Sequence, residues 1–318
     1  MVVLPPSSDC LDRERANSTV LTEVFLYYCI LFDVLVLLSV LLVNCLVITA
    51  IVKYRRYHTG TVRTYNSGAS MKFVVNLAVS DLLTGAGVFI LALTRYWCGF
   101  NELFCGNRYL CLMKFVPSFF GQVSSGLNLI AIAIDRYIAV FRSFRYRTIM
   151  TDRTCHITIL VLWVVAFIIT HSLYFWNMWG PQKECTLENV TPLSFILFVD
   201  SFFHLIVLVL VGGIHYKLHR KACESSSQQI LFRDAKTNIK SLKLVILVIG
   251  VYFFCWLPLS LLHIIGAVTR REESVYFYYA IRIVQPLRNM YIVINPFIYA
   301  WKNLEVRDSI KWFFKKQR

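Results

Sequence analysis

The chain alternates between long apolar segments and shorter polar segments from one end to the other. Each apolar segment contains about 20 or more residues, the length that a helix needs to cross the hydrocarbon core of a bilayer. The apolar segments lie at residues 24–52, 73–93, 110–141, 155–176, 193–211, 244–268 and 276–301. The pattern therefore predicts an all-α protein whose residues 24–301 form a bundle of seven transmembrane helices.

Two polar segments flank the predicted bundle. Residues 1–23 lack the basic start that precedes the apolar core of a signal peptide, so we expect an extracellular N-terminal segment. Residues 302–318 combine apolar and basic positions at helical spacing, for example Val306 and Ile310 against Arg307 and Lys311. That pattern predicts a short amphipathic eighth helix lying on the inner leaflet, in contact with membrane lipids.

Composition and charge support a membrane protein with a defined orientation. Hydrophobic residues make up 57% of the chain, the mean hydropathy is +0.59, and the net charge is +15. The basic residues lie in the gaps between apolar segments, which argues against nucleic acid as a partner. Segments 53–72, 142–153 and 217–243 and the tail are the basic ones, and basic loops face the cytoplasm. We therefore expect a multi-pass plasma-membrane protein with its N-terminus outside.

Features expected on the outer side agree with this orientation. Asn17-Ser18-Thr19 and Asn189-Val190-Thr191 are N-glycosylation patterns, and both fall in outer segments. Outer cysteines can form disulfides, and Cys111 and Cys185 are placed to tie the loop after the fourth span to the third. Spacing alone leaves other pairings open, because Cys10, Cys98 and Cys105 also lie outside.

Polar residues inside the predicted spans are the first candidates for function. Asn44, Asp81, Ser125 and Asn295 lie near the middle of the first, second, third and seventh spans. Buried polar groups are costly unless satisfied, so we expect one shared polar cluster in which the carboxylate can hold a monovalent cation. The alternative is a set of unrelated hydrogen bonds between helices.

The third span ends on Asp135-Arg136-Tyr137, where lipid gives way to water. A charged side chain at that depth is costly, and a functional role is its default interpretation. Pro258 and Pro296 lie inside the sixth and seventh spans, where each removes a helix hydrogen bond and predicts a kink. Kinked helices can pivot, which predicts two alternative packings of the bundle.

These features occur in an order that is known from one family. The motifs are Asn44, Leu77-Ala78-Val79-Ser80-Asp81, Cys111, Asp135-Arg136-Tyr137, Trp163, Cys255-Trp256-Leu257-Pro258 and Asn295-Pro296-Phe297-Ile298-Tyr299. Together they resemble the rhodopsin-like (class A) G-protein-coupled receptors. The second and fifth spans lack the prolines that are usual there. In this respect the chain most resembles the branch that includes the melanocortin, cannabinoid, lysophospholipid and adenosine receptors. Cys111 argues against the melanocortin group.

The resemblance implies a heterotrimeric G protein as the partner and no enzymatic activity. It implies that Asp135 holds Arg136 at rest and that the arginine is released on activation, when the tyrosines of spans five and seven approach it. The switch and coupling residues by resemblance are Asp135, Arg136, Tyr137, Phe144, Tyr216, Trp256, Pro258, Asn295, Pro296 and Tyr299. It also implies no cofactor other than a sodium ion held by Asp81, Ser125 and Asn295. Asn238 replaces an acid that restrains many family members, which predicts basal activity.

The outer half of the bundle is the expected ligand site. Ser118 stands where amine receptors carry an aspartate, which disfavours a protonated amine. The candidate pocket residues are Lys114, Phe115, Ser118, Phe119, Gln122, Asp200, His263, Arg282, Gln285 and Arg288. We expect Lys114, with Arg288 or Arg282, to receive the carboxylate or phosphate of an extracellular small-molecule or lipid-like ligand. The alternative is that Arg288 is neutralised internally, by Asp33 or Asp200.

Other classes of function fit the sequence less well. A secondary transporter often shows paired repeats and broken helices, and the sequence has no such repeat. An enzyme needs a nucleophile or metal constellation, and the histidines are scattered without ligand spacing. A non-signalling scaffold or decoy receptor is the remaining alternative, against which the intact Asp135-Arg136-Tyr137 argues.

Overall fold

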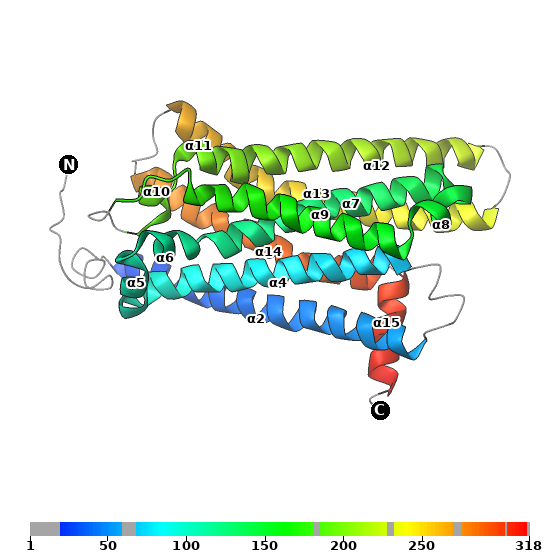
Figure 1. Cartoon of the computed structure of the whole chain (residues 1–318), viewed down its shortest axis with the longest axis horizontal. Coiled ribbons are helices and arrows are strands. Elements are labelled where there is room, and N and C mark those ends of the chain that lie inside the picture. The colour runs from blue at the N-terminus through cyan, green and yellow to red at the C-terminus, as the bar shows by residue number, and fades with distance from the viewer. Residues whose placement is uncertain are drawn as a thin grey trace.

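The computed structural model describes residues 20–58, 68–180, 185–227, 232–269, 275–302 and 304–316, and within these ranges every regular element is helical. The long helices run side by side as one elongated bundle (Figure 1). They are α2 (Val20–Tyr57), α4 (Gly68–Tyr96), α7 (Val116–Phe141), α9 (Asp152–His171), α12 (Phe203–Ser227), α13 (Phe232–Thr269) and α14 (Val275–Lys302). The predicted all-α bundle is confirmed.

Six of the described helical segments are long and apolar enough to cross a membrane on their own. The seventh predicted span corresponds to α14, which carries two internal prolines, Pro286 and Pro296. Polar residues such as Arg288 and Asn295 lower its hydropathy, yet α14 packs against α13, α2 and α4 as a full member of the bundle. Its polar side chains are tolerated because they face protein partners rather than lipid.

The third span differs from the single helix that the sequence predicts over residues 110–141. A short helix, α6 (Arg108–Met113), ends at Lys114, and α7 begins at Val116 with Pro117 in its first turn. A proline in the first turn of a helix costs no helix hydrogen bond, and its fixed backbone angle favours a helix start, which fits the position of Pro117. The break leaves Lys114 and Phe115 between the two helices, at the end of the bundle opposite α15.

Short elements close the two ends of the bundle (Figure 1). At one end lie α5 (Cys98–Cys105), α6, η2 (Ser172–Tyr174), α10 (Leu187–Val190) and α11 (Leu193–Ile196), and the π-helical turn η3 (Leu197–Phe202) leads from α11 into α12. At the other end lie η1 (Ser143–Arg145), α8 (Tyr146–Ile149) and α15 (Leu304–Lys316). The amphipathic eighth helix is therefore present as α15, which packs Val306 against the end of the bundle.

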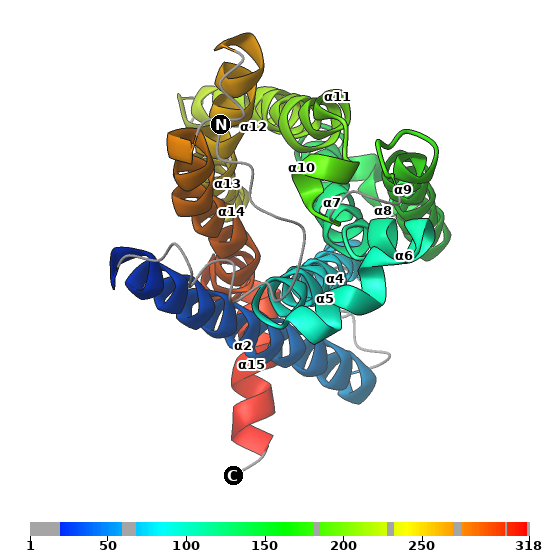
Figure 2. The ribbon, with the colours of Figure 1, turned by 90° about the vertical axis from the view of Figure 1, so that its left-hand side faces the viewer.

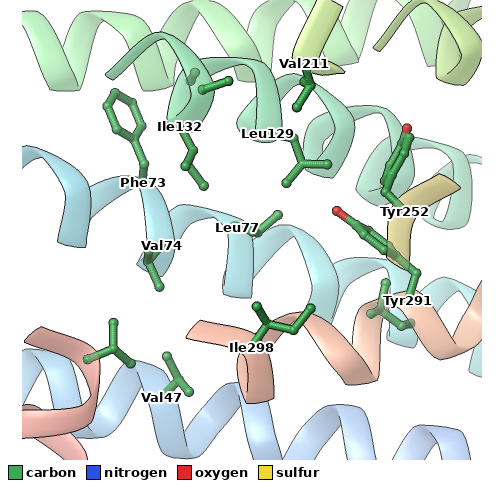
Figure 3. Packing of buried hydrophobic residues seen from close by; sticks show 14 of the residues in the cluster. Val47, Phe73, Val74, Leu77, Leu129, Ile132, Val211, Tyr252, Tyr291 and Ile298 are labelled. Atoms are coloured by element: carbon green, nitrogen blue, oxygen red, sulfur yellow. The ribbon is translucent and has the colours of Figure 1, made fainter. Parts of the chain in front are cut away.

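The apolar core runs the length of the bundle. Figure 3 shows one part of it, where Leu77, Leu129 and Ile298 from α4, α7 and α14 lie near Tyr252 and Tyr291. In the view along the bundle, the long helices form a ring and α9 lies at the rim beside α7 (Figure 2).

A chain of hydrogen bonds anchors α9 to its neighbours. Trp163 Nε1 donates to Asn76 Oδ1 at 2.8 Å, and Asn76 Nδ2 donates to Asn128 Oδ1 at 2.7 Å. The bonds therefore join α9 to α4 and α4 to α7. They help fix the helix that carries Asp135 and Arg136.

Candidate functional site

The end of α7 carries an ion pair between consecutive residues. Arg136 donates to Asp135 Oδ2 from Nη2 at 2.6 Å and from Nε at 3.0 Å. The Asp135 side chain is 1% exposed, whereas that of Arg136 is 27% exposed. A buried carboxylate is costly unless it is paired, so the guanidinium stabilises Asp135 and remains partly accessible from one end of the bundle.

A tyrosine from the following loop completes this ion pair. Tyr146 Oη donates to Asp135 Oδ1 at 2.7 Å, so both carboxylate oxygens are engaged. Burial and the charge of Asp135 raise the pKa of Tyr146 well above its ordinary value, which keeps the phenol protonated as a donor. Sequence reasoning did not identify Tyr146 as a functional residue, because its contact depends on how the loop of η1 and α8 folds back on α7.

Several of the other predicted coupling residues differ widely in exposure. Tyr137 stacks on Phe141 with ring centroids 4.4 Å apart. Phe144, in η1, is fully exposed at the tip of its loop, and Tyr216 of α12 is 70% exposed. Pro296 lies within α14, while the side chain of Tyr299 and the whole environment of Asn238 lie outside the described residues. Phe144 and Tyr216 are therefore available to a partner at this end.

The structure brings three of the four predicted mid-span polar residues together. Ser125 Oγ donates to Asp81 Oδ1 at 2.9 Å, and Asn295 Nδ2 donates to Asp81 Oδ2 at 3.2 Å. All three residues are almost completely buried. Asn44 is bound differently, because its Nδ2 donates to the backbone carbonyls of Val40 and Ile292.

The end of the bundle opposite α15 is held together by a disulfide and a buried lysine. Cys111 and Cys185 are disulfide-bonded, which confirms the predicted tie, and Cys105 carries a free thiol, while the side chain of Cys98 lies outside the described residues. Lys114 Nζ donates to the carbonyl of Cys185 and to Asn101 Oδ1 at 3.1 Å. The ammonium therefore ties the break in the third span to α5 and to the disulfide-bonded loop.

Asp200, His263 and Arg288 of the predicted pocket form a second group of charged or titratable side chains with little exposure. Arg288 Nη1 donates to Asp200 Oδ1 at 2.6 Å, and His263 Nδ1 lies 3.1 Å from Asp200 Oδ2. The alternative in which Arg288 is neutralised internally is thus the one that the structure shows, with Asp200 as the partner. Arg288 is engaged inside the protein, which leaves Lys114 as the better candidate for an acidic ligand.

An aromatic stack lies directly below this charged group. Trp256 stacks on His204 with centroids 3.4 Å apart, and the Arg288 guanidinium lies 5.7 Å from the centre of the indole. His204 in turn contacts the hydroxyl of Tyr252. Sequence reasoning identified Trp256 but missed His204 and Tyr252, since nothing in the local pattern distinguishes them from other buried residues.

Other pocket candidates pair with one another or lie apart. Gln122 Nε2 donates to Ser118 Oγ at 2.8 Å, and Phe119 makes an edge contact with Phe195. Phe115 is buried beside Lys114, whose ammonium lies 5.0 Å from the ring centre. Gln285 is half-buried on α14, and the side chain of Arg282 lies outside the described residues.

The structure is a helical membrane bundle with a paired arginine at one end and a buried carboxylate at mid-depth. A disulfide ties a loop at the other end. Together these features define a seven-helix membrane receptor. The comparison with protein families agrees with this class. Residues 43–299 match the family described as 7 transmembrane receptor (rhodopsin family). The chain belongs to this family, the rhodopsin-like class A G-protein-coupled receptors, whose members are receptors and not enzymes.

Several curated relatives are similar over most of the chain. Adenosine receptor A2b of Gallus gallus is 28% identical, with 78% of each chain covered. Adenosine receptor A2b of Homo sapiens is 27% identical, covering 78% of this chain and 80% of the receptor. Adenosine receptor A2a of Homo sapiens is 28% identical, covering 75% of this chain and 62% of that receptor.

Proposed function

We propose that this protein is a plasma-membrane receptor, with its N-terminus outside, that activates heterotrimeric G proteins by rearranging its helices. The observation that carries the proposal is the Arg136–Asp135 ion pair at the end of α7, closed by Tyr146. In this arrangement the Arg136 guanidinium lies near solvent but is bound to Asp135. A second packing of the kinked helices α13 and α14 would release it to a partner, and a ligand that binds one packing better shifts the balance.

The test is nucleotide exchange on a purified G protein by the receptor in lipid nanodiscs. Replacing Arg136→Gln removes the charge offered to the partner, and we expect exchange to fall by about tenfold or more, as for loss of a contact worth at least about 1.4 kcal/mol. Arg147→Gln, at an exposed arginine of the neighbouring α8, is the matched control and keeps the wild-type rate. Undiminished exchange by Arg136→Gln, at equal amounts of folded receptor, would contradict the proposal.

The same experiment separates the receptor from the scaffold or decoy alternative. A decoy binds its ligand without promoting exchange, so wild-type protein would leave the G protein in its basal state. A receptor with basal activity raises exchange before any ligand is added.

We further propose that Asp81, Ser125 and Asn295 bind a sodium ion at mid-depth. Their oxygens suit a hard cation, and Asn295 Oδ1 is buried without a hydrogen-bond partner among the described residues, so it is available as a ligand. Thermal unfolding of the purified receptor should shift upward in sodium relative to choline. Asp81→Asn should abolish that shift, and a shift that survives the substitution would place the ion elsewhere.

For the ligand, we propose an acidic small molecule or lipid whose charged group reaches Lys114. Two contacts of the Lys114 ammonium are to neutral oxygens, those of Asn101 and Cys185, and a carboxylate or phosphate is a stronger acceptor for an ammonium than either. Phe115, whose ring centre lies 5.0 Å from the Lys114 ammonium, and Phe119 of the same buried cluster offer apolar surface for the body of the ligand.

Three probes test this choice of ligand. A lysophospholipid with a free phosphate is compared with an uncharged monoacylglycerol of the same chain and with adenosine, the uncharged compound in the names of the relatives. Lys114→Gln should weaken the phosphate-bearing probe by about tenfold or more and leave uncharged probes nearly unaffected. If Lys114→Gln weakens all probes equally, the role of Lys114 is to hold the outer loops and not to bind the charged group of the ligand. A response to adenosine alone would favour a ligand like that of the relatives.

A further inference from the structure

Asp200 links three transmembrane helices through one buried carboxylate. It lies in the π-helical turn η3 at the start of the fifth span, and its side chain is 2% exposed. One carboxylate oxygen accepts from Arg288 of α14 at 2.6 Å, and the other lies 3.1 Å from Nδ1 of His263 of α13. Any change in the charge of these groups therefore acts on the relative positions of the fifth, sixth and seventh spans at their outer half.

This charged group is in direct contact with the aromatic residues beneath it. The Arg288 guanidinium lies over the ring of Trp256, and the other histidine of the region, His204, stacks on the same indole. Trp256 is two residues before Pro258, where α13 lacks a helix hydrogen bond. A shift in the Asp200 contacts is thus transmitted to the place where the sixth span can pivot.

The side chain through which α13 contacts Asp200 is a histidine, His263. Arginine stays protonated in proteins, and Asp200 is paired with it, whereas histidine is the side chain that changes charge between about pH 5 and 8. The described titratable or charged groups that surround the Asp200 carboxylate, which His263 faces, are His263 from α13, His204 from α12 and Arg288 from α14. His204 is 2% exposed and already bound to Tyr252, whereas the His263 side chain is 14% exposed and the more accessible to protons.

We propose that His263 is a proton-binding site through which extracellular acidity controls the receptor. A protonated imidazole at 3.1 Å attracts the Asp200 carboxylate and strengthens the tie between α13 and η3. Arg288 repels the added charge, but it engages the opposite oxygen of the carboxylate, so the imidazolium and the guanidinium bind different oxygens of Asp200. The tie is made in the same packing in which Asp135 holds Arg136, and strengthening it favours that packing. Acidity outside therefore lowers signalling.

The proposal rests on G-protein coupling. The proton site is tested in intact cells that carry a G-protein activation sensor, with only the outer medium acidified. Wild-type activity should fall by about fivefold between about pH 7.5 and about pH 6, the lower end of typical coupling between sites. His263→Gln, which is always uncharged, should show the higher activity at both values. His263→Lys, which is always charged, should show the lower activity at both.

The matched control is His171→Gln. His171 also lies toward the outer end, at the end of α9, where its ring stacks on Phe167 and its Nδ1 contacts the carbonyl of the same residue. This variant should keep the wild-type response to acid. Loss of the response in His171→Gln, or its survival in His263→Gln, would overturn the assignment to His263.

A second measurement keeps the proton site distinct from the coupling. Purified receptor without G protein should unfold at a higher temperature at about pH 6 than its His263→Gln variant, with the two closer at about pH 7.5. If wild-type receptor activates G proteins equally at both pH values, the proton site is refuted while the coupling stands. If no activation occurs at any pH, the coupling fails, and the unfolding temperatures alone decide whether His263 binds the proton as proposed.

Discussion

At the scale of single residues, the Asp135 carboxylate has both oxygens engaged, by Arg136 and by Tyr146. Replacing Tyr146→Phe removes one of its hydrogen bonds and leaves Oδ1 buried without that donor. Hydrogen bonds to charged groups are worth about 1.5–3 kcal/mol, so the resting packing should weaken and basal nucleotide exchange should rise by about tenfold. Tyr109→Phe, at an exposed tyrosine, is the control and should show the wild-type rate.

The effect of pH on this contact follows from the raised pKa of Tyr146. A tyrosine whose folded-state pKa lies above its ordinary value of about 10 contributes fully below that value and loses its contribution only as the pH rises beyond it. The difference between wild type and Tyr146→Phe should therefore be constant from about pH 6 to about pH 9. A difference that shrinks within that range would mean that Asp135, not Tyr146, controls the contact.

Single residues also show where sequence reasoning stops. The consecutive pair Asp135-Arg136 could be predicted, because a charge at the edge of an apolar span requires a partner and the neighbour supplies it. The partner of Arg288 could not be chosen between Asp33 and Asp200, since both lie in apolar spans. The choice depends on the rotation of each helix, and for Asp200 that rotation is set within the π-helical turn η3.

At the scale of helices, the closest packing is between α4 and α7. A Cβ added at Gly121 of α7 would collide with the backbone nitrogen and hydroxyl of Thr84, and one at Gly87 of α4 would collide with the backbone of Ser118. Gly121→Ala must therefore separate the two helices, and overpacking of this kind typically costs about 1–3 kcal/mol. We expect a lower unfolding temperature of the purified receptor, together with a weaker sodium response, because Ser125 and Asp81 lie on the same two helices.

Gly212 and Gly213 of α12 provide the matched controls for this substitution. A Cβ at either position meets nothing within 4 Å, so alanine there should be neutral or stabilise the helix by up to about 1 kcal/mol. If the Gly121→Ala and Gly212→Ala receptors unfold at the same temperature, α4 and α7 are not held at the close distance seen here.

Helices also mark the limit of prediction from hydrophobic pattern. The pattern located every long helix of the bundle but not the break at Lys114, where Pro117 starts a new helix within an apolar run. It also did not predict α5, which is only eight residues long and lies between spans. Short helices are stabilised by tertiary contacts rather than by periodicity, so a pattern that extends over spans carries little information about them.

At the scale of the whole molecule, the charge distribution makes a prediction about orientation. The described basic residues at the α15 end include Arg55 and Arg56 in the last turn of α2, Arg145 and Arg147 in the loop of η1 and α8, and Lys311 and Lys315 in α15 itself. The opposite end carries the disulfide and Asn189, whose glycosylation pattern requires exposure to the lumen. Positive charge is retained on the cytoplasmic side, so the α15 end should be inside.

Epitope tags at the two termini of the receptor test this orientation in intact cells. An antibody should stain the N-terminal tag without permeabilisation and the C-terminal tag only after it, because an odd number of spans puts the ends on opposite sides. Removal of N-linked glycans should increase gel mobility, and Asn17→Gln with Asn189→Gln should reproduce the faster form. Staining of the C-terminal tag on intact cells would invert the molecule, place Arg136 outside and make its proposed contact with a G protein impossible.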